Sequence, residues 1–187
     1  MEHQHTNYPS ELEHAVNELI AAYTDAEIAY LTAGANAACE KIGHLPNLTR
    51  YLRARAHVIF FRRAALINFQ TRRGAAVEMI APTNASSHKK PVESVKELIE
   101  QVLKELIEMA EKQGDAVTAA FAKKDLDTKK AKIVPQATHI YNAFHQAESP
   151  FTYDSLAMKE EAEEQEERAK RLMSMECGSR KSAYSKC

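Results

Sequence analysis

The sequence predicts an all-α protein, a four-helix bundle with one long crossover connection between its second and third helices. Its 187 residues include only five Gly and six Pro, and helix-forming Ala, Glu, Leu and Lys are abundant. Apolar residues also recur at helical spacing in several long segments. The connections between these segments are short, long and medium in turn, an order that fits a bundle with one crossover.

The first helix is predicted to begin at Ser10. Ser10 followed by Glu13 has the pattern of a capping box, and Pro9 opposes extension of the helix upstream. Apolar residues then recur at spacings close to 3.6 until the pattern fades near Ala38. Residues 1–9 are therefore expected to form a disordered N-terminus.

The second helix is predicted at roughly residues 46–73. Pro46 suits the first turn of a helix, and Gly74 stands where a left-handed C-terminal cap belongs. A long connection follows at residues 75–90. Because loops of this length are uncommon inside a compact domain, we expect this one to cross the bundle from end to end.

The third helix is predicted from Pro91 to about Lys124 and has the clearest periodicity in the chain. Gly114 lies within it and costs about 1 kcal/mol relative to alanine. Residues 125–149 then read as a polar insertion that is interrupted by Pro135.

The fourth helix is predicted at roughly residues 154–175, with Asp154 as its N-cap. This segment is unusually polar for a helix of a bundle. The bundle as a whole is expected to span residues 10–175, and residues 176–187 are expected to form a flexible tail.

Composition excludes several classes of protein. Lys+Arg 25 against Asp+Glu 26 gives a formal charge of −1, so the chain is not a polycation. It has no run of 18 apolar residues and no apolar leader, so we expect neither a membrane span nor secretion. The three cysteines, Cys39, Cys177 and Cys187, do not make a disulfide framework, and the expected location is the cytoplasm.

Five segments resemble the ferritin family in the family's own order. FQTRRGAAVEMIAPTN resembles the end of the ferritin second helix and its following loop, and LPNLTRYLRARAH resembles the start of that helix. YTDAEIAYLTAGANA, VESVKELIEQVLKELIEMA and SPFTYDSLAMKEEAEEQ resemble the first, third and fourth helices. The resemblance covers roughly residues 10–124 and 149–173, and it implies a ferritin-like four-helix bundle.

The resemblance also implies where a catalytic iron site would lie. Active ferritins oxidise Fe(II) at a di-iron centre held by carboxylates and an imidazole. The matching positions in this sequence are Tyr23, Ile59, Arg62, Leu106 and Glu164. Of these, only Glu164 has a side chain able to touch a metal. The fixed charge of Arg62 would repel iron. We therefore expect no ferroxidase activity, no catalytic residue and no cofactor, with iron present only if a residual storage role survives.

Two other parts of the sequence contain residue types that bind metal ions, although the signal at each is weak. Glu11 and His14 have the i, i+3 spacing of a carboxylate–imidazole pair, and His3 could bind Cu(II) together with a free terminal amine. An acid in a first turn also suits the helix dipole, and a terminus is commonly unstructured. The metal-free interpretation is favoured for both.

The second helix is unusually rich in arginine and has no acidic residue among its arginines. One interpretation is a basic surface for RNA or for an acidic protein partner. The favoured alternative is that the arginines pair with the acidic third and fourth helices. The absence of Gly-rich phosphate loops and of aromatic platforms weighs against nucleic acid. The residues concerned are Arg50, Arg53, Arg55, Arg62, Arg63, Arg72 and Arg73.

The leading functional prediction is a non-catalytic ferritin-like structural or assembly subunit, acting alone or with other ferritin-like subunits in an oligomer. The first alternative is a protective interaction protein, chaperone-like or binding RNA or an acidic partner through the Arg-rich second helix. The second alternative is residual iron storage within a ferritin cage. The sequence shows no Ser-His-Asp, Cys-His or paired-carboxylate arrangement that favours another enzyme.

Overall fold

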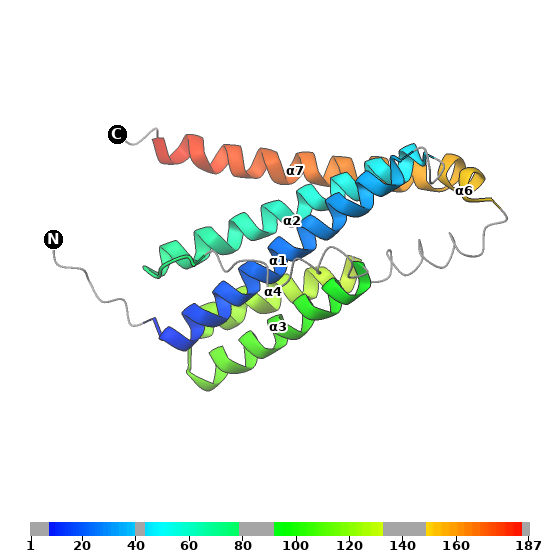
Figure 1. The fold of residues 1–187 in the computed structure, drawn as a ribbon. Helices are drawn as coiled ribbons and strands as arrows, with labels where there is room; N and C mark the ends of the chain where they lie inside the picture. Colours follow the sequence, from blue (N-terminus) through cyan, green and yellow to red (C-terminus); the bar gives the residue numbers. More distant parts are fainter. Residues whose placement is uncertain (1–7, 40–43, 79–91, 133–148, 185–187) are drawn as a thin grey trace.

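A computed structural model of the chain describes residues 8–39, 44–78, 92–132 and 149–184 (Figure 1). These residues form helices joined by turns and contain no strand, which confirms the all-α prediction for the described part of the chain. Within these ranges, no helix is both long enough and apolar enough to cross a bilayer. Residues 79–90 of the predicted crossover and residues 133–148 of the predicted insertion lie outside the described residues.

The two longest predicted helices have nearly the expected bounds. α1 spans Ser10–Ala37 and α2 spans Pro46–Arg72. They run antiparallel along much of their length (Figure 1). Gly74 has a φ of 77° just after α2, as expected for a left-handed cap, and the Ala75 amide donates to the carbonyl of Gln70 at 3.2 Å.

The capping box predicted at the start of α1 does not form, because the N-cap is Pro9 and Ser10 already lies inside the helix. The Glu13 carboxylate instead accepts a hydrogen bond from the Ala76 amide at 2.9 Å. The side chain of Gln70 also donates to the Glu13 carbonyl at 2.9 Å. These bonds fasten the beginning of α1 to the end of α2.

The prediction of one third helix reaching Lys124 is wrong, because the chain turns back at Gly114. α3 spans Val92–Lys112 and α4 spans Ala116–Lys132, and they pack against each other as a hairpin. Gly114 has a φ of 73°, which glycine adopts without steric cost. The next residue, Asp115, accepts hydrogen bonds from the Thr118 amide at 3.1 Å and the Thr118 hydroxyl at 2.8 Å. Gly114 thus ends α3, and the following residue, Asp115, caps the start of α4. Because α4 continues to Lys132, residues 125–132 of the predicted insertion are helical.

The main hydrophobic core is built by α1, α2, α3 and α4. The predicted fourth helix contributes none of its buried residues to this core, and α4 contributes Ala119, Ala122 and Leu126. The other buried members come from the faces of α1, α2 and α3 that meet along the bundle axis. They are Leu12, Ala15, Val16, Leu19, Ile20, Ala22, Tyr23, Ala26, Ala29, Tyr30, Ala56, Ile59, Leu66, Ile99, Leu103, Leu106 and Ala110.

The predicted fourth helix is divided into two helices that pack on α2. α6 spans Pro150–Leu156 and α7 spans Met158–Tyr184, so much of the predicted flexible tail is helical. α7 begins beside the start of α2, runs in the same direction and diverges from it (Figure 1). A small second cluster of Tyr51, Met158 and Ala162 holds the two helices together where they are closest.

Asp154 caps a helix, although not the one that was predicted. The N-cap of α6 is Ser149, and Asp154 lies inside α6. The Asp154 carboxylate accepts the backbone amides of Asn47 at 3.2 Å and Leu48 at 2.7 Å, both at the start of α2. The first turn of α2 has no acidic residue of its own. Asp154 therefore supplies the negative charge that the N-terminal end of the α2 dipole favours.

Candidate interaction site along the second helix

The positions expected to hold iron ligands are filled by packed or ion-paired side chains. Tyr23, Ile59 and Leu106 are buried in the main core. Arg62 and Tyr23 both donate to Asp125 of α4, Arg62 to Oδ1 at 3.0 Å and Tyr23 to Oδ2. Three helices thus meet at one hydrogen-bonded cluster, Tyr23–Asp125–Arg62.

This cluster is suited to holding helices together. Burial, and next the negative charge of Asp125, raise the pKa of the Tyr23 phenol well above its usual value, so the phenol remains a neutral hydrogen-bond donor. Arg62 occupies the other carboxylate oxygen with a permanent positive charge. Both oxygens of the single carboxylate in the cluster are therefore engaged by protein donors.

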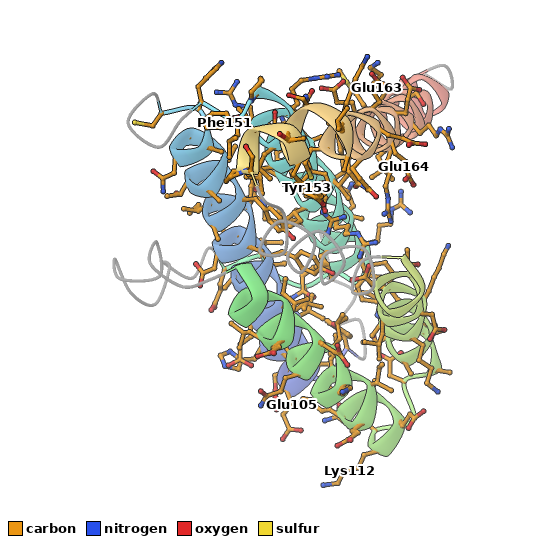
Figure 2. All side chains as sticks on the ribbon, turned by 90° about the vertical axis from the view of Figure 1, so that its right-hand side faces the viewer. Glu105, Lys112, Phe151, Tyr153, Glu163 and Glu164 are labelled. Atoms are coloured by element: carbon orange, nitrogen blue, oxygen red, sulfur yellow. The ribbon has the colours of Figure 1, made fainter. Side chains whose placement is uncertain are left out.

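Sequence reasoning missed Asp125, because it was assigned to the insertion after the third helix. Only the turn at Gly114 carries Asp125 back along the bundle to meet α1 and α2. Glu164, the one matched position that kept a carboxylate, is exposed on α7 and is not part of the core. Figure 2 shows Glu164 on the side of α7 nearer to α4 and Glu163 on the outer side.

Four of the seven predicted arginines make ion pairs with other helices or turns. Arg50 forms a two-pronged pair with Glu166 of α7, with both N···O distances 2.9 Å. Two further pairs join α2 to α4 and to α1, and the last joins Arg73, directly after α2, to the turn before α4. They are Arg62–Asp125 at 3.0 Å, Arg63–Glu27 at 2.9 Å and Arg73–Asp115 at 2.5 Å.

The remaining three arginines are placed differently. Arg53 and Arg72 are exposed, and no ion pair is found for either one within the described residues. Arg55 is 3% exposed and faces α7. Its Nη1 donates to the side-chain oxygen of Gln165 at 3.4 Å, its guanidinium lies 5.5 Å from the Tyr30 ring centre, and its Nε has no hydrogen-bond partner.

Arg168 of α7, which sequence reasoning did not select, lies near Arg55 and Arg62 of α2. Burial lowers the pKa of its guanidinium, and the positive charges of Arg62 and Arg55 lower it further. Arg168 is half-buried, three residues beyond Gln165 and hence about one helical turn away on the same face of α7. Arg168 therefore lies close enough to Arg55 and Arg62 of α2 for their charges to act on it.

A groove of about 730 Å³ opens on another side of the interface between α2 and α7, where the two helices diverge. Its lining is largely apolar, and Phe60 is 43% exposed and Met173 58% exposed. Phe60 and Phe61 pack edge to face with ring centres 5.4 Å apart. The full lining combines apolar and charged side chains of α1, α2 and α7. It consists of Glu27, Arg50, Arg53, Ala54, His57, Phe60, Phe61, Glu166, Ala169, Lys170 and Met173.

The two weak metal candidates are not brought together with further ligands in the described structure. His3 lies outside the described residues. Glu11 accepts a hydrogen bond from Gln113 at 2.5 Å, and His14 lies 3.5 Å from Glu18. Among the described residues, no group of three or more His, Cys, Asp or Glu side chains is arranged to hold a metal ion.

Comparison with known proteins does not assign this chain to a family. No protein-family model matches the chain, and no curated protein matches it. The ferritin resemblance therefore stays a prediction from the sequence.

Proposed function

We propose that this chain is a non-catalytic ferritin-like subunit that acts by assembly and binding and does not oxidise iron. The observation that carries the proposal is the Tyr23–Asp125–Arg62 cluster at the expected iron positions. A di-iron centre needs several carboxylate or imidazole ligands around an open position. This cluster offers one carboxylate, already bound to two donors, beside a permanent positive charge.

An Fe(II) oxidation assay on the purified protein tests the non-catalytic part of the proposal. We expect the rate in air to equal that of buffer and of an unrelated helical protein at the same concentration. A rate clearly above both controls would show that another set of ligands oxidises iron, and it would overturn the proposal.

The assembly part of the proposal is supported by the groove between α2 and α7. Its apolar floor and the cation of Arg53 suit an acidic helix with some apolar side chains. α3 of a second copy presents such a face, with exposed Glu97, Glu105 and Glu108 beside Leu98, which is 37% exposed. Glu105 lies on the outer side of α3 (Figure 2). Because groove and acidic face are different surfaces, this contact is heterologous and builds rings or open chains.

Light scattering coupled to size exclusion tests this contact. We expect the wild-type protein to form oligomers that weaken as salt is raised. Arg53→Glu should shift the protein toward the monomer, because it reverses a charge in the groove. Arg72→Glu is the matched control, since Arg72 is an exposed arginine of the same helix that does not line the groove. A wild-type monomer at all concentrations, or equal effects of both variants, would contradict the assembly proposal.

An acidic partner other than a second copy is the alternative that the same groove favours. It predicts a monomer alone in solution that binds an added acidic helical peptide. That binding should be weakened by Arg53→Glu and unaffected by Arg72→Glu.

A further inference from the structure

The groove between α2 and α7 changes in character along its length. Its α2 wall runs from Arg50 to Phe61, and its α7 wall runs from Glu166 to Met173. The Arg50–Glu166 ion pair, at 2.9 Å, joins the two walls at one end. Because the helices run in the same direction and diverge (Figure 1), Phe61 and Met173 lie toward the wider end. The groove is therefore charged where it is narrow and apolar where it is wide.

The wide end offers hydrocarbon surface to a ligand. Phe60 is 43% exposed and Met173 is 58% exposed, and both line the groove. The Phe60 ring is held in place by the edge of Phe61 and by the guanidinium of Arg63, which lies 5.4 Å from the ring centre. The groove volume of about 730 Å³ is in the range of small-molecule sites. Covering these side chains would remove apolar surface from water.

Both carboxylates that line the groove are already bound to arginine. Glu166 accepts two hydrogen bonds from Arg50, each at 2.9 Å. Glu27 of α1 pairs with Arg63 at 2.9 Å. Glu163, whose charge also acts on Arg50, does not line the groove. Neither lining carboxylate therefore pairs with the other arginine of the lining.

That other arginine, Arg53, presents its positive charge at the narrow end of the groove. The side chain is exposed, and no hydrogen bond or ion pair is found for it within residues 8–39, 44–78, 92–132 and 149–184. Its stem packs close to Gly34 of α1, where an added Cβ would lie 3.5 Å from the Arg53 Cγ. Lys170, the lining cation on α7, pairs with Glu167 at 2.9 Å. Arg53 is thus an anchored cation whose head group is open to a ligand.

We propose that this groove binds a small amphipathic carboxylate, with its head group at Arg53 and its hydrocarbon body over Phe60 and Met173. A guanidinium donates two parallel hydrogen bonds to a carboxylate. Phe60 lies seven residues beyond Arg53, which is about 10 Å along the helix axis. A short anion would reach only the cation, and a neutral hydrocarbon would use only the apolar end. One copy of the chain contains the whole site, so this inference goes beyond the proposed assembly.

Calorimetric titration of the full chain with octanoate, at neutral pH and constant ionic strength, tests the site. We expect saturable binding with a dissociation constant of about 1 mM or tighter. Acetate supplies only the head group and octan-1-ol only the body, so each should bind at least about 10-fold more weakly. The ε-methyl resonance of Met173, identified by its loss in Met173→Leu, should shift along the octanoate curve. No saturable octanoate binding, or equal affinity for octan-1-ol, would overturn the proposal.

Matched variants locate the two parts of the site. Arg53→Gln should weaken octanoate binding by about 5-fold or more, because it removes a charge-assisted partner. Arg72→Gln makes the same change on an exposed arginine outside the groove and should stay within about 2-fold, since screening weakens distant charges. Phe60→Ala should weaken binding by lost apolar contact, whereas Leu31→Ala should not, because Leu31 is 44% exposed but does not line the groove. Equal effects within either pair of variants would overturn the proposal.

Competition with a second copy is the one arm of the test that rests on the proposed assembly. Octanoate would occupy the groove that α3 of another copy fills, so light scattering should show a shift toward the monomer. A wild-type monomer at all concentrations that still binds octanoate would contradict the assembly and support the carboxylate site. Oligomers that remain unchanged, in a protein that shows no octanoate binding, would overturn the carboxylate site alone.

Discussion

The contact between Asp154 and the start of α2 makes a sharp prediction about stability. Asp154 is 2% exposed, and its carboxylate accepts two backbone amides, from Asn47 at 3.2 Å and Leu48 at 2.7 Å. Replacing it with alanine removes the cap and the charge at the α2 N-terminus, and it leaves these amides without an acceptor. The combined loss is about 2–4 kcal/mol, from the usual costs of a lost cap, a lost dipole partner and unsatisfied amides.

Urea denaturation at neutral pH, followed by helical circular dichroism, measures this loss. For a protein of this size the same change should lower the melting temperature by roughly 5–15 °C. Asp154→Asn should fall between alanine and wild type, because it keeps an acceptor oxygen and loses the charge. Ser149→Ala is the matched control, since the side chain of Ser149 makes no cap hydrogen bond at the start of α6. It should cost less than about 0.5 kcal/mol.

The outcome that refutes the reasoning is equally specific. If Asp154→Ala and Ser149→Ala lower the free energy of unfolding by the same small amount, Asp154 does not cap α2. The packing of α6 against the start of α2 would then be in error as well.

Three further predictions concern the helix ends and the expected iron positions. Gly114→Ala should destabilise the fold by about 1–2 kcal/mol in urea denaturation, because alanine at a φ of 73° is strained although its Cβ would meet no neighbour; a neutral or stabilising result would contradict the turn. Burial opposes ionisation of Asp115, but the Thr118 amide and hydroxyl and the Arg73 charge outweigh it and lower its pKa. Its carboxylate therefore stabilises the folded state above about pH 4, and this contribution is lost as pH falls through the lowered pKa; melting temperatures of wild type and Asp115→Asn should converge in acid. Tyr23→Phe should cost about 1–2 kcal/mol in the same denaturation assay, because it removes the hydroxyl bound to Asp125, and an unchanged stability would show that this bond contributes nothing.

Much of the first half of the fold follows from local signals. The bounds of α1 and α2 follow from apolar residues at helical spacing and from Pro46 and Gly74, whose effects act within a few residues. At Gly114 the local signals were present but ambiguous, because a glycine within a periodic segment is compatible with a continued helix or with a stop. The positive φ of Gly114 and the Asp115 cap show that the chain turns there.

The candidate site depended on contacts that no local pattern carries. Tyr23 and Asp125 are 102 residues apart, and Asn47 and Asp154 are 107 residues apart. The sequence also shows that α2 is rich in arginine, but which of these side chains are buried depends on which helices pack against α2.

The sequence by itself determined that this chain is helical and where its first two helices lie, because helix propensity and apolar spacing act locally. The tertiary structure decided which aspartate meets Tyr23 and Arg62, and that Arg55 is buried against Gln165 of α7. These are outcomes of how the helices pack, since burial and charge pairing depend on neighbours that are distant in the chain.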